Sequence, residues 1–121
     1  MATATQELIR TAVDRFTGEL PALAKLKLVF KLELVGRGDV QMFRVELPGP
    51  KISKDIGNDE RLTITLPRAT FNDLAEKGSV KGYHQAYDIG HIKVEGDEQV
   101  QKLLAQVIER HEERAKLKKA H

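Results

Sequence analysis

The sequence contains no cysteine and no tryptophan, and it has only two tyrosines and four phenylalanines among 121 residues. Without cysteine, neither a disulfide framework nor a thiol nucleophile can form. The longest strongly apolar stretch is Leu28-Val29-Phe30, far short of the roughly 20 residues that cross a bilayer. The first residues also lack the basic and apolar regions of a secretory signal. We therefore expect a cytoplasmic protein without a membrane-spanning segment.

The composition is that of a soluble globular protein, with 40% hydrophobic and 31% charged residues. A chain of this length is typical of one domain, which we expect over residues 1–121. Residues 109–121 hold five lysines and arginines against three glutamates, an excess that equals the whole formal charge of +2. This basic helical tail fits a transient contact with an anionic membrane surface. It also fits a solvated helix end whose cations complement the helix dipole.

Hydrophobic periodicity predicts the order of the secondary structure. A helical stripe covers residues 5–17, with Gly18 and Pro21 as its stop. Strands are expected over 25–34, 40–47, 52–56, 61–66 and 91–95, where apolar and polar residues alternate.

Three helices complete the prediction. Pro67 opens the first, because its missing N–H is harmless in a first turn, and Gly78 closes it. A second short helix lies between Val80 and Gly90, and a long helix runs from an Asp97 cap to about residue 118. Strands with one polar face and helices with one apolar stripe predict an α+β fold of two layers, with all helices on one side of the sheet.

No catalytic or metal-binding constellation is found. His111-Glu112-Glu113 begins like a zinc-protease motif, but Ala115 stands where the second histidine must be. Gly36-x-Gly38 begins a dinucleotide fingerprint, but a strand follows instead of a helix. Neither serine lies in a nucleophile elbow. We expect no enzyme, no cofactor and no metal, although catalysis by Tyr83 or His84 at a pocket stays an alternative.

Nucleic acid is not an expected partner. Lys25, Lys27 and Lys31 share the outer face of the first predicted strand, and Arg44 and Lys51 are candidate neighbours. The aromatic residues that would stack on bases are missing from that face.

The segment AYDIGHIKVEGD, at residues 86–97, leads directly into the apolar-periodic helix that follows. It resembles the ending of the sterol carrier protein type 2 (SCP2) domain, in which two glycines flank a short strand before the last helix. The resemblance covers about residues 26–108 and includes the TITLP strand at 63–67. Gly90 and Gly96 are its most specific part.

The resemblance implies a free-standing SCP2-like domain. Its fold would be a five-stranded, largely antiparallel sheet with helices packed on one face, enclosing an apolar tunnel. The implied function is non-enzymatic binding and transfer of a hydrophobic ligand, such as a fatty acid, acyl-CoA, a sterol or an isoprenoid. An accessory or protein-interaction module, for example in isoprenoid quinone metabolism, is the alternative, with a packed core and no transported lipid. A homodimer stays open.

Apolar and aromatic side chains of several predicted elements converge on one region. The sequence does not tell a filled core from a hollow one. If the core is hollow, the expected ligand-binding residues are Leu28, Phe30, Leu32, Phe71, Leu74, Tyr83, Tyr87, Ile92, Leu103, Leu104 and Val107.

Overall fold

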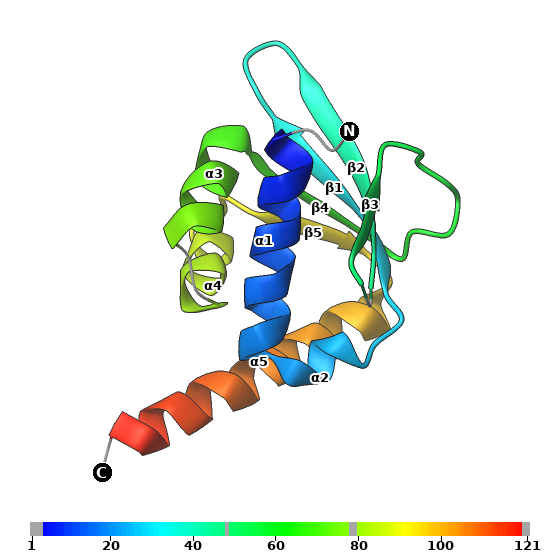
Figure 1. Ribbon diagram of the computed structural model, residues 1–121. Helices are drawn as coiled ribbons and strands as arrows, with labels where there is room; N and C mark the ends of the chain where they lie inside the picture. The colour runs from blue at the N-terminus through cyan, green and yellow to red at the C-terminus, as the bar shows by residue number, and fades with distance from the viewer. Residues whose placement is uncertain (1–3, 48, 78–79, 120–121) are drawn as a thin grey trace.

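The computed structural model describes residues 4–47, 49–77 and 80–119. The structure contains a five-stranded sheet (Figure 1). Along the chain, helices precede the first strand, lie between the fourth and fifth strands, and follow the last strand. The elements in chain order are α1 (Ala4–Glu19), α2 (Pro21–Ala24), β1 (Val29–Val35), β2 (Val40–Glu46), β3 (Lys51–Ser53), β4 (Leu62–Pro67), α3 (Arg68–Lys77), α4 (Val80–Asp88), β5 (Lys93–Gly96) and α5 (Glu98–Lys119).

The strand order in the sheet is β3-β2-β1-β4-β5. The pairs β1–β2, β2–β3 and β4–β5 are antiparallel, whereas β4 lies parallel to β1. The β1–β2 hairpin closes through a hydrogen bond from Gly36 N to Asp39 O of 2.9 Å, with Gly38 at a φ of 78°. The predicted α+β class and largely antiparallel sheet are confirmed.

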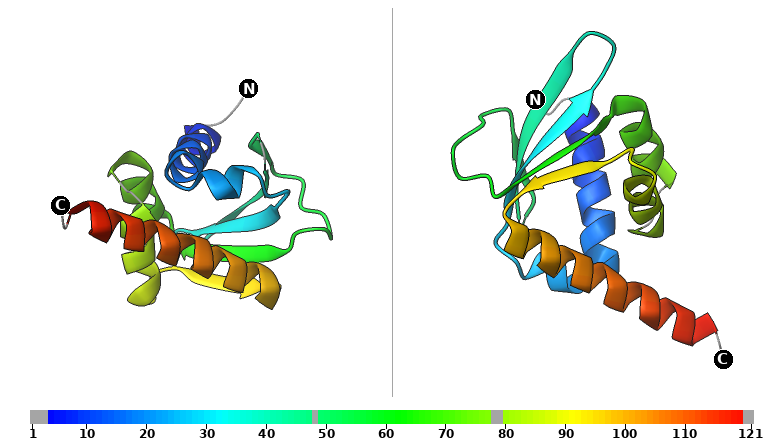
Figure 2. Two further views of the ribbon diagram at one scale, coloured as in Figure 1. Left: turned by 90° about the horizontal axis from the view of Figure 1, so that it is seen from below. Right: turned by 180° about the vertical axis from the view of Figure 1, so that it is seen from behind.

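Alternation along the strands separates an inner from an outer sheet face. Leu32 and Leu34 of β1 are buried, as are Phe43 and Val45 of β2, which point to the same side. The residues that alternate with them, such as Lys31 and Glu33, point to the other side. Figures 1 and 2 show the helices gathered on one side of the sheet, as the polar and apolar faces of the strands predict.

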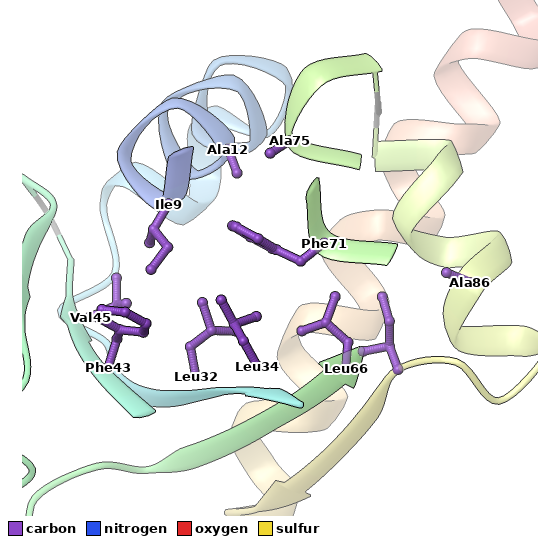
Figure 3. Packing of buried hydrophobic residues seen from close by; sticks show 11 residues of the cluster. Ile9, Ala12, Leu32, Leu34, Phe43, Val45, Leu66, Phe71, Ala75 and Ala86 are labelled. Atoms are coloured by element: carbon purple, nitrogen blue, oxygen red, sulfur yellow. The ribbon is translucent and has the colours of Figure 1, made fainter. Parts of the chain in front are cut away.

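The main core lies between the inner sheet face, α1 and α3 (Figure 3). Ile9 and Ala12 of α1 point down toward the sheet, while Phe71 and Ala75 of α3 approach from the side. A second cluster joins the end of α1 to α2, α4 and α5 around Val80. A third cluster packs Val100 and Leu104 of α5 against Leu62 of β4, so α5 is also held to the sheet.

Several predicted boundaries differ from the structure. α1 passes through Gly18 and ends at Glu19, and Pro21 begins the unpredicted helix α2. α1 cannot continue through Pro21, which lacks the N–H that a helix interior needs, but proline is tolerated in the first turn of the new helix. β3 is shorter and earlier than the predicted 52–56, and Pro67 pairs with Val35 as the last residue of β4 instead of opening α3. The predicted stop at Gly78 lies outside the described residues.

The start of α5 is fixed as predicted. Asp97 Oδ1 accepts hydrogen bonds from the backbone N–H groups of Gln99 (2.9 Å) and Val100 (3.3 Å), which caps the helix. Arg61 donates to Asp97 Oδ2 at 2.6 Å, and this contact lowers the pKa of the Asp97 carboxyl. The C-terminal half of α5 extends past the other elements (Figures 1 and 2). Over the described residues, no helix combines the length and apolar character needed to cross a membrane.

Candidate functional site

A cavity of about 300 Å³ lies between the inner sheet face and the helices. Every helix contributes to its wall, together with β1, β4 and β5. Its volume falls at the lower end of the range of about 300–1,000 Å³ that is typical of small-molecule sites. Helix side chains thus cover only part of the inner sheet face, and an apolar space is left beside the packed main core.

The structure brings most of the predicted site residues together around this cavity. Those that line it are Leu28, Phe30, Leu32, Phe71, Tyr83, Tyr87, Ile92 and Leu104. Three others do not line it. Leu74 packs against the main core, Val107 packs in the cluster around Val80, and Leu103 is 40% exposed. Leu103 differs from Leu104 because successive residues of a helix point about 100° apart.

One wall of the cavity, formed by α1 and α2, was not predicted from the sequence. Ile9, Ala12, Val13 and Phe16 of α1 line the cavity, and Leu23 of α2 adds to this wall. The apolar stripe of α1 is visible in the sequence, and it shows that the helix must pack against something. It does not show that the helix faces a cavity.

The mouth of the cavity lies between α4 and α5. Three lining residues are themselves exposed to solvent: Tyr87 of α4, and Ala105 and Glu109 of α5. On the sheet side, Leu32 of β1 and Leu66 of β4 line the cavity and are buried. A ligand therefore has an apolar interior on the sheet side and water on the side of Tyr87 and Glu109.

Tyr83 occupies the wall of the cavity near Phe16. The two rings meet edge to face, with 5.4 Å between centroids and an angle of 78°. The Tyr83 hydroxyl is buried and has no hydrogen-bond partner among the described residues. Burial raises the pKa of Tyr83 to about 12. Tyr83 is therefore a neutral group at physiological pH and does not act there as a proton acceptor.

His84 ties α4 to α5 beside the mouth. Its Nδ1 is in hydrogen-bond contact with Glu112 Oε1, and its Nε2 lies 3.6 Å from Asp88 Oδ1. The contact with Glu112 raises the pKa of His84 above its ordinary value, burial opposes this effect, and the charges of Asp88 and Glu109 add to it. Folding therefore stabilises the protonated imidazolium of His84 relative to the neutral ring.

This geometry predicts a pH-dependent contribution of His84 to stability. The folded-state pKa is raised, so the contribution is complete below the unfolded pKa of about 6.5 and is lost as the pH rises through the folded value. The melting temperature should therefore fall more in His84→Gln at pH 6 than at pH 9. His91→Gln, which changes an exposed histidine, is the matched control and should show no such difference. An equal loss at both pH values in His84→Gln would contradict the prediction.

The cavity wall carries few groups that could take part in chemistry. Its polar side chains are Thr17, Tyr83, His84, Tyr87, Gln101 and Glu109. Within the described residues, no three His, Asp or Glu side chains gather as metal ligands would. What the arrangement offers is an apolar volume with a partly polar mouth, which suits a molecule with a long hydrocarbon part.

Comparison with solved structures finds SCP2 domains. Sterol carrier protein 2 like 2 from Aedes aegypti, solved in its palmitated form, has a TM-score of 0.57 and 23% identity, and the match covers 83% of this chain and 93% of that one. Apo sterol carrier protein 2 from Yarrowia lipolytica has a TM-score of 0.52 and 19% identity, with 74% and 85% covered.

A third solved structure is the ubiquinone synthesis protein UbiJ-SCP2, with a TM-score of 0.51 and 16% identity. That match covers 87% of this chain and 97% of the other. A scan against protein-family models and a search of curated proteins give no match. The strand order, the helices on one sheet face and the likeness to these structures together show that the chain has the SCP2 fold.

Proposed function

We propose that the protein binds a lipid with a single hydrocarbon chain or ring system in the cavity, and that it carries this ligand without chemical turnover. The observation that carries the proposal is the apolar cavity between the sheet and the helices. The cavity has a volume of about 300 Å³, and some of the side chains that line it, such as Ile9, Leu32 and Phe71, also pack in the main core. A protein that needed only a stable core would fill this volume, because side chains placed there would bury further apolar surface, at about 25 cal/mol per Å².

The expected affinity is moderate. Each methylene group that leaves water contributes about 0.8 kcal/mol, so ten of them give about 8 kcal/mol before losses. Association and chain ordering take several kcal/mol of this gain. If about 4 kcal/mol of the gain is lost, the dissociation constant is about 1 mM, and each further methylene group that leaves water tightens it about fourfold. Affinities of this order would allow release to another protein or a membrane.

The neighbours in fold support this proposal. The Aedes aegypti protein is named as a sterol carrier protein and was solved in its palmitated form. At 23% identity the likeness concerns the fold, so the ligand of this chain has to be measured. The cavity lies on the sheet face that the helices cover, which is where a carrier must shield a chain from water.

Native mass spectrometry of protein purified without detergent tests the proposal. Added long-chain alcohol, fatty acid or sterol should give a complex with one ligand per chain for at least one of these classes. A mass that stays that of the free protein with all three classes would refute binding.

An accessory or interaction module is the second candidate, and one observation favours it. Val35, Val40 and Met42 lie on the outer sheet face and are 40%, 48% and 45% exposed. Val35 pairs with Val40 in the hairpin, so these side chains form a small apolar patch far from the cavity. One of the neighbours in fold is named as a ubiquinone synthesis protein. Failure of every lipid class to bind would favour this candidate.

A further inference from the structure

The mouth of the cavity is acidic. Glu109 lines the cavity and is exposed, and Glu112 and Asp88 lie beside it around His84. A protonated His84 carries one positive charge against these three carboxylates. Even in that state, the mouth has a net negative charge.

Cations are missing from the rest of the wall. Among the described residues that line the cavity there is no lysine and no arginine. Arg15 of α1 is close enough to act electrostatically on Tyr83, but it is not a lining residue. Lys102 of α5 is exposed and does not line the cavity either. Among the described lining residues, a protonated His84 is the one group that carries positive charge, and its two ring nitrogens already face Glu112 and Asp88. An anionic group inside the cavity would therefore have no unoccupied cation of the wall to pair with.

These two observations restrict which polar group a ligand can carry at its end. An unpaired carboxylate cannot stay in the apolar interior, because its desolvation is too costly. It would have to lie at the mouth, next to Glu109, where the two negative charges repel. A hydroxyl group at the same place can donate a hydrogen bond to the Glu109 carboxylate, and this is a favourable, charge-assisted contact.

Resting on the lipid-binding function proposed above, we propose that the cavity selects lipids that end in an uncharged hydroxyl group and disfavours lipids that end in a carboxylate. Glu109 is the residue that sets this selectivity. Linear alcohols, isoprenoid alcohols and sterols share the favoured chemistry.

The test compares two ligands of equal chain length. Equilibrium dialysis of dodecan-1-ol and dodecanoate is carried out at pH 8, where the carboxylate is ionised. We expect the alcohol to bind at least tenfold more tightly to the unchanged protein. Farnesol and cholesterol, measured in the same way, then show which hydroxyl-ended class fits the cavity best.

Two variants test whether the mouth of the cavity causes the difference in affinity between the alcohol and the carboxylate. In Glu109→Gln the ratio of the two affinities should shrink severalfold, mainly because dodecanoate binds better. Glu113→Gln changes the net charge equally at an exposed residue of α5 that does not line the cavity, and it should keep the ratio. Thermal melting of both variants verifies that they fold.

The outcomes separate the two proposals. Equal affinities, or tighter binding of dodecanoate, would overturn the selectivity and leave lipid binding in place. An unchanged ratio in Glu109→Gln, or the same change in Glu113→Gln, would overturn the role of Glu109. Absence of binding by all four ligands would overturn the selectivity together with the lipid-binding function.

Discussion

Leu104→Arg should abolish measurable lipid binding, whereas Leu103→Arg should leave the affinity within about twofold of the unchanged protein. Leu104 lines the cavity and packs against two clusters of buried residues. An arginine there places a charge in the apolar interior against a hydrocarbon chain, whereas the carboxylate on the cavity wall, Glu109, lies at the mouth. This is a costly arrangement. Leu103 is 40% exposed and does not line the cavity, so an arginine at that position can reach water.

The pair is matched, because both variants add the same charge to the same turn of α5. Displacement of a fluorescent fatty-acid or alcohol probe measures the affinity, and circular dichroism verifies the fold. Loss of packing makes Leu104→Arg less stable, by about 2–4 kcal/mol. Ala105→Trp therefore serves as a second variant, since it narrows the mouth without adding a charge. Normal affinity in folded Leu104→Arg and in Ala105→Trp would exclude the cavity as the binding site.

Gly96→Ala should be the most damaging of the glycine substitutions. Gly96 ends β5 at a φ of 125°, in a region of backbone conformation that side chains rarely adopt. A Cβ atom there would lie 2.3 Å from the carbonyl oxygen of Arg61 and 3.0 Å from Cα of Leu62. Both are backbone atoms of the neighbouring strand segment, so the strand itself must move. We expect a loss of roughly 3 kcal/mol, or about 10 °C in melting temperature.

Two other glycines provide controls for this prediction. Gly90 has a φ of 84°, but a Cβ atom there meets nothing within 4 Å. Gly90→Ala should therefore cost only the backbone strain, about 1 kcal/mol. Gly18 lies inside α1 with nothing within 4 Å and no positive φ, so Gly18→Ala should stabilise the helix by about 0.5–1 kcal/mol. Equal melting temperatures for the three variants would contradict the assigned roles.

The glycines also show how much of the fold the sequence predicts. The segment from residue 86 to 97 is a specific marker of the fold, because Gly96 permits a close backbone approach that no other residue tolerates. Alternation in β1 and β2 predicts which residues face the helices, since a one-residue shift would turn charged side chains inward. The Asp97 cap is predicted because the residue type and its place before an apolar stripe are both typical of a helix start.

The cavity, in contrast, depends on long-range geometry. Leu103 and Leu104 are neighbouring residues of the same type, so the sequence does not tell which of them faces the cavity. The rotation of α5 about its axis decides this. His84 and Glu112 are 28 residues apart, and no local pattern connects them. The extent of the domain over residues 1–121 and the cytoplasmic location stay predictions. So does the contact of the basic tail with membranes, because its side chains beyond Arg114 lie outside the described residues.

Solution NMR with a ¹³C-labelled dodecan-1-ol tests the central claim most directly, because it reports which side chains touch the ligand. The account predicts nuclear Overhauser contacts from the chain to the methyl groups of Leu32 and Ile64, both of which line the cavity on the sheet side. It also predicts contacts from the hydroxyl end to Ala105 at the mouth. Contacts confined to exposed residues such as Ile89 and Met42, with none to Leu32 or Ile64, would contradict it.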